Sequence, residues 1–311
     1  MSQIFMKAVR FHDYGGPEVL VVDQVPIPRP QPDQVLIRLI AAGVNPADIG
    51  FRSGYFKEFM PVMLPWIPGQ EGSGIIEEVG PDVKHLHKGQ AVFGFFSGCY
   101  AEYVAVRAGD LQLKPTHLTF EQAAAVSMGG LTAWQAVESA NIQPDQRVLI
   151  HGAAGGVGSF AVQFARLKGA EVIGTASAKN VELVRSLGTN QVIDYNNDRF
   201  ETVVHNVDAV LDTVGGEITG RSWQVIKPDG ILVHVVGRLT PEQTEQARIR
   251  GVRAASGGLA PKEKLKDIAE LLESKLITAV VGDIFPLAEA SRAHELSQTR
   301  HGHGRIILLT A

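Results

Sequence analysis

The length, composition and charge of the chain exclude several classes of protein. At 311 residues it is long enough for two domains, and an apolar share of 45% with 20% charged residues is ordinary for a globular protein in water. The net charge of −4 gives no electrostatic reason to bind nucleic acid or an anionic membrane. The single cysteine, Cys99, cannot form an internal disulfide. Because no signal peptide or uninterrupted membrane span is visible, we expect a cytoplasmic protein.

The first third of the chain is rich in short strands and turns. Apolar runs predict strands at Val19–Val22, Gln34–Ile40 and Gly74–Val79. The proline-rich segment Pro26–Pro32 cannot be a central strand, because proline has no amide hydrogen, and we interpret it as an extended connector. This region therefore predicts a compact β-rich domain, such as a partly open barrel.

The pattern changes near Phe120, where helices begin to alternate with strands. The alanine-rich segment Glu121–Ala140 predicts a helix, and the alternation that follows predicts a parallel sheet with crossover helices. A helix from Pro286 to Thr299 precedes a last strand, Arg305–Leu309, and pairing of that strand with the N-terminal domain would make this domain discontinuous. The other predicted strands are 147–150, 172–175, 191–193, 209–211 and 231–236. The other predicted helices are Val181–Leu187 and Lys262–Lys275, the latter with an apolar face of Leu265, Ile268, Ala269, Leu272 and Leu276.

A glycine-rich turn at His151–Gly158 is the most informative local feature. It lies between an apolar strand, Arg147–His151, and a helix with apolar residues from Phe160 to Leu167. Glycines let the backbone approach a pyrophosphate closely, and the free amides and dipole of a helix start favour its negative charge. The strand–turn–helix–strand context therefore predicts a dinucleotide site.

The residues after the next strand indicate which dinucleotide. An NAD site of this type places Asp or Glu about 20 residues after the turn, to bind the ribose 2′-hydroxyl. The segment Thr175–Asn180 has no acid, but it contains Ser177 and Lys179. A hydroxyl and a cation suit a 2′-phosphate, so we predict NADPH rather than NADH. The missing acid also argues against a methyltransferase. The alternative is that Ser177 and Lys179 only form a solvated helix start.

Several motifs occur in an order that is typical of one superfamily. In the N-terminal part they are 6–10, 15–20, 42–48, 52–54, 68–74, 78–80, 88–89 and 98–103. In the nucleotide half they are 130–134, 153–158, 192–195, 211–216 and 285–287. With these motifs the chain resembles the medium-chain dehydrogenase/reductase superfamily, and within it the zinc-free quinone oxidoreductases related to zeta-crystallin. The resemblance covers nearly the whole chain.

The resemblance implies an α/β fold of two domains. These are a GroES-like β-rich catalytic domain and a Rossmann nucleotide-binding domain with a doubly wound parallel sheet. We expect the catalytic domain at 1–121, completed by 284–311, and the NADPH-binding domain at 122–283. Relatives are commonly homodimers joined through the nucleotide-binding domain, to which the stretch Arg248–Gly258 is a candidate contributor.

Residue types at the zinc positions of the alcohol dehydrogenase relatives predict no metal. Asn45 stands where the first zinc-binding Cys would be, and Gln70 replaces the His of the His-Glu pair. Cys99 is the only thiol, so a lobe of four clustered cysteines is impossible. Two further pairs lie in turn-like sequence and are interpreted as solvated surface: His85 with His87, and His301 with His303.

By resemblance, Asn45 and Thr132 flank the nicotinamide, and Asn45 also donates to the substrate oxygen. The alternative for Asn45 is a turn residue before Pro46. Tyr195 would contact the adenine or 2′-phosphate, or would merely cap a strand, and Thr213 and Gly237 would either face the ligand or close tight turns. The predicted cofactor-binding set comprises Asn45, Thr132, Ala154, Gly155, Gly156, Val157, Gly174, Ser177, Lys179, Tyr195, Thr213, Val236 and Gly237.

The loop after the Asn-Pro motif departs from its relatives, which often carry tyrosines near the substrate. The aligned positions hold Gly50 and Phe56, and Tyr55 lies one residue early. We count Tyr55 as a catalytic candidate together with Asn45 and Thr132; otherwise the proton comes from water. The aromatic loop 55–61 is expected to line the substrate entrance, or else to belong to the domain core.

These observations predict a zinc-independent, NADPH-dependent reductase. Without a metal to polarise a carbonyl, alcohol oxidation fits poorly, and hydride delivery to a quinone or an α,β-unsaturated carbonyl fits better. An oxygen that gains charge then needs only a hydrogen-bond donor and a proton. Two alternatives stay open: an enoyl-thioester reductase, and a non-catalytic NADPH-binding sensor or structural protein.

Overall fold

The structure, a computed structural model, describes residues 4–310 and divides them into two compact units. Unit 1 comprises residues 4–128, 262–274 and 279–310, and unit 2 comprises Gly129–Pro261 and Lys275–Thr278. The chain therefore leaves unit 1, forms unit 2 and returns. The domain division at 121/122 and 283/284 stays a prediction.

Unit 1 is built mainly of antiparallel sheet. Strands β1 and β2 form a two-stranded sheet, and a seven-stranded sheet has the order β14-β15-β3-β4-β5-β7, with β6 also paired to β3. The strands are β1 (Phe5–Arg10), β2 (Val21–Pro26), β3 (Gln34–Val44), β4 (Glu71–Val79), β5 (Ala91–Phe95), β6 (Tyr103–Arg107), β7 (Leu111–Leu113), β14 (Val281–Pro286) and β15 (Arg305–Leu309). The helices are α1 (Pro46–Arg52), α2 (Phe120–Ala124), α9 (Lys264–Glu273) and α10 (Ala290–Thr299), with 3₁₀ turns at Pro17–Val19, Ala108–Asp110 and Leu287–Glu289.

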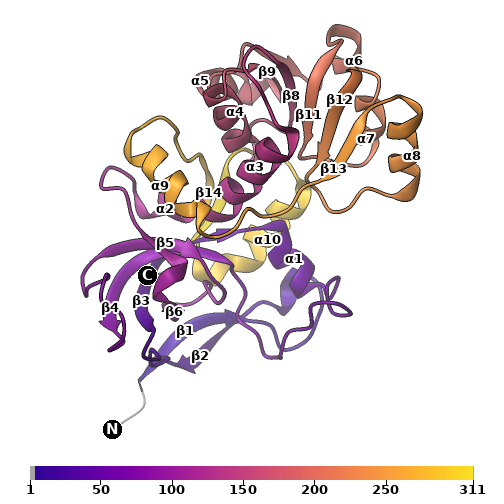
Figure 1. The fold of residues 1–311 in the computed structure, drawn as a ribbon. Helices are drawn as coiled ribbons and strands as arrows, with labels where there is room; N and C mark the ends of the chain where they lie inside the picture. Colours follow the sequence, from indigo (N-terminus) through magenta and orange to yellow (C-terminus); the bar gives the residue numbers. More distant parts are fainter. Residues whose placement is uncertain (1–3, 311) are drawn as a thin grey trace. The chain divides into compact units, whose positions relative to one another are not determined.

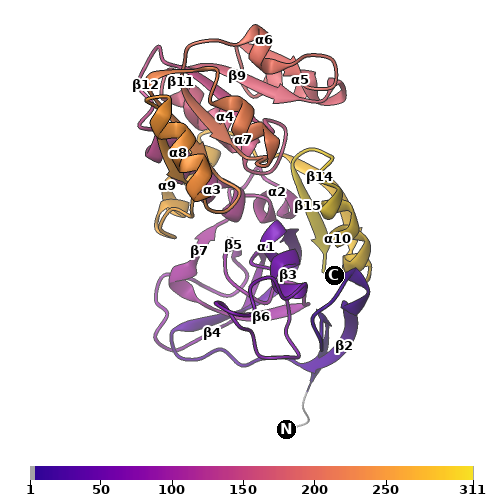
Figure 2. The ribbon, with the colours of Figure 1, turned by 90° about the vertical axis from the view of Figure 1, so that its right-hand side faces the viewer.

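The C-terminal strand completes the N-terminal sheet, as the sequence predicted. β15 pairs antiparallel with β3, with Ile307 opposite Gly43, and parallel with β14. Helix α10 packs on β14 and β15 (Figure 2). The core of unit 1 includes Ile37 and Leu39 of β3 and Leu308 of β15.

Two sequence expectations in unit 1 were wrong. The strand predicted at Val19–Val22 begins only at Val21, because Pro17–Val19 forms a 3₁₀ turn with the proline at its first position. Pro26 is the last residue of β2 rather than part of a connector. Its ring is tolerated there because β2 pairs with β1 alone.

Unit 2 contains a six-stranded parallel sheet in the order β10-β9-β8-β11-β12-β13. Figure 1 shows β9, β8, β11, β12 and β13 side by side in this order. This is the strand order of a Rossmann fold, in which ligands bind beyond the carboxyl ends of the central strands. The strands are β8 (Arg147–His151), β9 (Glu171–Ala176), β10 (Gln191–Asp194), β11 (Val207–Asp212), β12 (Ile226–His234) and β13 (Arg253–Ser256). The helices are α3 (Ser127–Ala140), which begins at the end of unit 1, α4 (Gly158–Leu167), α5 (Val181–Ser186), α6 (Phe200–Val203), α7 (Glu217–Ser222) and α8 (Pro241–Ile249), with a 3₁₀ turn at Ala178–Asn180.

The helical expectations need three corrections. The helix predicted from Pro286 to Thr299 begins only at Ala290, because Pro286 ends β14 and Leu287–Glu289 forms a 3₁₀ turn. The helix predicted over Glu121–Ala140 is divided into α2 and α3, because the cap residue Ala125 ends the short helix α2 that Thr119 begins. Leu276 does not belong to the apolar face of α9, since α9 ends at Glu273 and the side chain of Leu276 is 48% exposed. No helix within residues 4–310 is long and apolar enough to cross a membrane.

Candidate active site

The glycine-rich turn lies at the carboxyl end of β8, where it leads into α4. Gly152 adopts a φ of +65°, and a Cβ added there would lie 2.6 Å from Thr213 Oγ1. A Cβ on Gly158 would lie 2.1 Å from the Gly152 carbonyl oxygen. Both positions therefore require glycine. Gly155, Gly156 and Val157 are half-buried, so the turn presents backbone rather than bulky side chains to a ligand.

The segment after β9 is open to solvent and carries a cation. Ser177 is half-buried and accepts a 3.2 Å hydrogen bond from Asn180 Nδ2, whereas the Lys179 side chain is exposed. Gly174, within β9, packs closely: an added Cβ would lie 2.9 Å from Ala153 Cβ. The backbone of β9 thus approaches the turn, and a hydroxyl and an ammonium group follow it.

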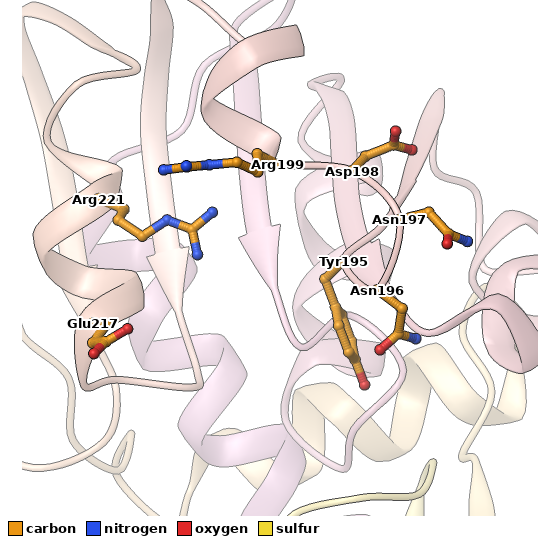
Figure 3. A pocket seen from close by; sticks show the side chains of 7 residues that line it. All are labelled: Tyr195, Asn196, Asn197, Asp198, Arg199, Glu217 and Arg221. Carbon is orange, nitrogen blue, oxygen red and sulfur yellow. The ribbon is translucent and has the colours of Figure 1, made fainter.

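Tyr195 borders a polar hollow of about 320 Å³ that lies entirely within unit 2. Figure 3 shows Tyr195 on the loop after β10, and Glu217 and Arg221 across the hollow on α7. Tyr195 is 48% exposed, so its ring is available to a ligand. It also follows β10 directly, and its amide donates to the Ala176 carbonyl, so the strand-cap reading is compatible with the geometry.

A charge cluster that sequence reasoning missed forms one side of this hollow. Arg199 and Arg221 both pair with Glu201, at 2.7 Å and 2.6 Å. The hydrogen bond from Arg221 lowers the pKa of Glu201 to about 2, against the opposing effect of burial. Glu201 therefore holds both guanidinium groups in place while remaining ionised. Arg199 and Glu201 are two residues apart, but Arg221 is 20 residues from Glu201 on α7, so the complete cluster depends on the fold.

The carboxyl ends of β11 and β12 form the opposite part of the ligand-facing edge. Thr213 Oγ1 donates to the His151 carbonyl oxygen at 2.7 Å, so its hydroxyl stabilises the turn. Asp212 is fully buried and accepts from the amides of Val214 and Gly215 and from Thr219 Oγ1. Burial by itself would raise the pKa of Asp212, but the hydrogen bonds from His234, Gly215 and Thr219 lower it below its usual range.

Two further predicted residues lie beyond β12. Val236 is 43% exposed, and Gly237 is exposed with a φ of +91°. Thr132 lies on α3 and is half-buried, and Ala154 is buried in the turn. Of the predicted site residues, Asn45 and Tyr55 belong to unit 1, and all the others belong to unit 2.

In unit 1, Asn45 is buried beside an acid. Asn45 Nδ2 donates to Glu71 Oε1 at 3.0 Å, whereas Asn45 Oδ1 has no hydrogen-bond partner among the described residues. Glu71 Oε2 accepts from the Met128 amide at 2.7 Å, and Arg305 Nε lies 3.1 Å from Glu71 Oε1. Because a carboxylate can only accept, Glu71 fixes the orientation of the Asn45 amide. One Nδ2 hydrogen and the Oδ1 lone pairs are left for a ligand.

Asp48 binds the backbone on both sides of this cluster. Asp48 Oδ2 accepts from the Asn45 amide at 2.8 Å, and Asp48 Oδ1 accepts from the Gly69 amide at 3.1 Å. Burial raises the pKa of Asp48 to about 7, although these two hydrogen bonds oppose the rise. The Tyr100 hydroxyl lies 3.5 Å from Asp48 Oδ2 and 3.1 Å from His294 Nε2, so the buried polar chain continues to α10.

The tyrosine-poor loop has a structural explanation. A Cβ on Gly50 would lie 2.4 Å from Phe56 Cε2, so glycine makes room for the Phe56 ring. Phe56 also packs edge-to-face with Phe51, at a centroid distance of 5.0 Å, and belongs to the apolar packing of unit 1. Tyr55 is 74% exposed and contacts the rings of Phe56 and Phe59. Whether Tyr55 reaches a substrate stays a prediction.

The positions that hold zinc in alcohol dehydrogenase relatives carry weak ligands. Asn45 offers an amide and Gln70 another, and Cys99 is fully buried with its thiol donating to the Phe96 carbonyl. Burial and the nearby Asp48 and Glu71 carboxyls raise the pKa of the Cys99 thiol well above its usual range. Within residues 4–310 no group of three or more His, Cys, Asp or Glu side chains could hold a metal ion. The pairs predicted as solvated surface are exposed: His85 with His87, and His301 with His303.

Known families and proteins resemble both parts of the chain. Residues 31–116 match the alcohol dehydrogenase GroES-like domain, and residues 187–308 match the family described as zinc-binding dehydrogenase. The quinone oxidoreductase of Sus scrofa is 33% identical over 99% of this chain and 99% of its own length. The chloroplastic NADPH-dependent alkenal/one oxidoreductase of Arabidopsis thaliana is 33% identical over 97% of this chain and 79% of its length.

Solved structures agree with these matches. The quinone oxidoreductase from Coxiella burnetii superposes with a TM-score of 0.89 and 34% identity, covering 99% of this chain and 100% of the other. The Escherichia coli quinone oxidoreductase complexed with NADPH gives a TM-score of 0.87 and 30% identity, covering 97% and 99%. A GroES-like domain combined with a Rossmann domain defines the class. The chain belongs to the quinone oxidoreductase family of the medium-chain dehydrogenase/reductase superfamily, which confirms the resemblance and the fold class predicted from the sequence.

Proposed function

We propose that the protein is an NADPH-dependent reductase that transfers hydride to a quinone or to an α,β-unsaturated carbonyl. The observation that carries this proposal is the glycine turn of unit 2, followed at the end of β9 by Ser177 and Lys179 instead of an acid. Relatives of nearly full coverage support it, since they are named quinone oxidoreductase and NADPH-dependent alkenal/one oxidoreductase.

The residues of unit 2 fit this cofactor. An added Cβ would clash with Thr213 Oγ1 at Gly152 and with the Gly152 carbonyl oxygen at Gly158, so this backbone is shaped for close approach. Gly155, Gly156 and Val157 would bind the pyrophosphate with their amides, next to the N-terminus of α4. Ala154 and Gly174 also belong to the proposed cofactor-binding set. The other contacts are proposed for Ser177, Lys179 and Tyr195 at the 2′-phosphate and adenine, and for Thr213, Val236 and Gly237 along the sheet edge.

The chemistry divides between cofactor and protein. Bound NADPH supplies the hydride, and the protein orients the reactants and stabilises the charge that develops on the acceptor oxygen. We propose Asn45 and Thr132 for the nicotinamide end. The amide of Asn45, held by Glu71, has one N–H for an acceptor oxygen and Oδ1 for a donor on the cofactor. Tyr55 is the proposed proton donor, with water as the alternative.

We further propose that this reaction requires no zinc. The support is the donor set: two amides at Asn45 and Gln70, and a buried Cys99 whose pKa is raised. Zinc prefers thiolate, imidazole and carboxylate ligands, and neutral amides are poor substitutes. Metal analysis of the purified protein tests this, because stoichiometric zinc that is lost together with activity contradicts it.

The assembly and the domain limits are also proposals. Strand β13 is an edge of the six-stranded sheet, which is compatible with a homodimer joined through the stretch Arg248–Gly258. We place the catalytic domain at 1–121 with 284–311 and the nucleotide-binding domain at 122–283. A cytoplasmic location stays a prediction, and one relative carries the word chloroplastic in its name.

The decisive experiment follows NADPH oxidation by absorbance, with a quinone and an enone offered separately and NADH run in parallel. We expect turnover with NADPH and little with NADH. Lys179→Ala would remove a charge-assisted hydrogen bond to the 2′-phosphate. We therefore expect it to raise KM for NADPH about tenfold and to leave KM for NADH unchanged, because NADH has no 2′-phosphate. Lys168→Ala serves as the control, because it removes an exposed cation at the C-terminal end of α4, away from the turn.

Each other outcome has a defined meaning. Equal use of both cofactors contradicts the 2′-phosphate assignment. Tight NADPH binding without turnover of either acceptor supports the alternative of a non-catalytic NADPH-binding sensor. Turnover of an enoyl thioester alone supports the alternative of an enoyl-thioester reductase.

A further inference from the structure

A line of buried polar side chains lies beneath the glycine turn and has no part in the proposed chemistry. It consists of Thr175 at the end of β9, His151 at the end of β8, and Ser222 on α7, each 4% exposed or less. His151 Nδ1 lies 3.3 Å from Thr175 Oγ1, and His151 Nε2 lies 3.0 Å from Ser222 Oγ. All three residues belong to unit 2.

The partners at each end fix the direction of every hydrogen bond. Ser222 Oγ donates its hydrogen to the Ile218 carbonyl at 2.7 Å, so it must accept from His151 Nε2–H. Burial lowers the pKa of His151 to about 4, and the ring is therefore neutral near pH 7. With the hydrogen on Nε2, Nδ1 is an acceptor, and Thr175 Oγ1 donates to it.

The Thr175 hydroxyl then has its lone pairs free for the turn. The Gly152 amide donates to Thr175 Oγ1 at 3.2 Å, and the next amide, of Ala153, donates to the Thr175 carbonyl oxygen at 3.0 Å. One residue thus binds two successive amides of the turn. These bonds hold Gly152 at its positive φ, with its carbonyl oxygen accepting from the Gly155 amide at 2.9 Å.

We propose that Thr175 and His151 are positioning residues for the cofactor: His151 orients the Thr175 hydroxyl, which fixes Gly152 and thereby aims the amides of residues 155–157 at the pyrophosphate. This inference rests on the proposed function. Both side chains are buried, so in this proposal they act through the turn and not by contact with the cofactor. Their contribution is preorganisation of the turn, which lowers the entropy that must be lost when the cofactor binds.

The test compares Thr175→Val with Thr175→Ser. Valine keeps the shape of threonine but removes the hydroxyl, whereas serine keeps the hydroxyl. For Thr175→Val we expect the Kd and KM for NADPH to rise about tenfold, with kcat at saturating NADPH and KM for the acceptor changed less than about twofold. Thr175→Ser should restore NADPH binding to within about threefold of the wild type.

A matched control separates positioning from stability. Thr189 is half-buried in the same unit, and its hydroxyl donates to the Val184 carbonyl at 3.1 Å rather than to the turn. Thr189→Val should therefore lower Tm without changing the Kd for NADPH. If Thr175→Val lowers Tm but binds NADPH as the wild type does, Thr175 is merely structural and the inference is wrong.

A second measurement on the wild type covers the case in which Thr175→Val does not fold. Nitrogen NMR of labelled histidine should show His151 as the neutral Nε2–H tautomer at pH 7. An Nδ1–H tautomer or a charged ring would reverse the bond to Thr175 and overturn the inference. Absence of saturable NADPH binding in the wild type contradicts the proposed function as well, whereas equal affinity of wild type and Thr175→Val contradicts the inference alone.

Discussion

The two units support their site residues with buried polar clusters of different kinds. Beneath Asn45 in unit 1, the cluster is ionic, because Glu71 bonds the side chain of Asn45 and pairs with a buried guanidinium, Arg305. Beneath the glycine turn in unit 2, the line of His151, Thr175 and Ser222 carries no charge when the imidazole is neutral.

The difference matters because removing one member has different consequences. Loss of one charge from a buried ion pair leaves the other charge without compensation, which is among the most destabilising changes known. Loss of one neutral hydroxyl costs the desolvation of its partners, about 1–3 kcal/mol. We therefore expect unit 1 to respond in stability and in pH dependence, and the turn of unit 2 to respond mainly in cofactor affinity.

The largest expected effect is that of Glu71→Gln. The change keeps the size of the side chain but leaves Arg305 buried without its carboxylate, so we expect the free energy of unfolding to fall by about 3–5 kcal/mol. Glu77→Gln is the matched control, since Glu77 pairs with Arg38 at 3.0 Å with both side chains about one-third exposed, and it should cost at most about 1 kcal/mol. Denaturant unfolding measures both. Equal costs would show that the buried pair has no special role.

Asp48→Asn tests the ionic cluster through pH. Burial raises the pKa of folded Asp48 from 3.8 to about 7, and Glu71 adds to the rise while Arg305 opposes it. Between these values the folded chain holds a proton that the unfolded chain has lost, so this group makes the free energy of unfolding fall as pH rises from about 4 to about 7.

Asparagine cannot titrate, so the stability of Asp48→Asn relative to the wild type should rise over that range, by on the order of 1–4 kcal/mol in total. The burial of His151, with its pKa near 4, acts in the opposite direction: its stabilising contribution is lost as pH falls from about 6.5 to about 4. The contribution of His151 is the same in variant and wild type, so it cancels when their free energies of unfolding are compared at each pH. A constant difference would mean that Asp48 has an ordinary pKa when folded.

The local features of both units could be predicted from the sequence. Strand β8, the turn and α4 follow one another directly, so apolar runs and glycine spacing were sufficient to predict them. The break between α2 and α3 was missed, because the many alanines outweighed the weaker helix formers Val126 and Ser127 that follow the cap residue Ala125. Leu276 was wrongly assigned to α9 because period alone does not locate a helix end.

The clusters beneath the sites could not be predicted in the same way. Thr175 and His151 are 24 residues apart, and His151 and Ser222 are 71 apart, so their proximity depends on the order of the strands. Glu71 did carry a signal: a carboxylate at the start of a glycine- and isoleucine-rich strand requires a partner when buried. The partner, Arg305, lies on β15, and the sequence predicted only that this strand pairs with the N-terminal domain, not that it pairs with β3.

The smallest expected effects concern the backbone of unit 2. There, the same substitution of glycine by alanine should change the stability in opposite directions at two positions. Gly152→Ala forces a side chain into a φ of +65° and against Thr213 Oγ1, which should destabilise unit 2 by about 1–2 kcal/mol and weaken NADPH binding. Gly220 lies inside α7, and an added Cβ there meets nothing within 4 Å. Gly220→Ala should therefore stabilise the protein by about 0.5–1 kcal/mol through helix propensity and leave the Kd for NADPH unchanged. Thermal unfolding with and without NADPH measures both terms, and if Gly152→Ala retained wild-type affinity, the turn would not need the conformation that Thr175 holds.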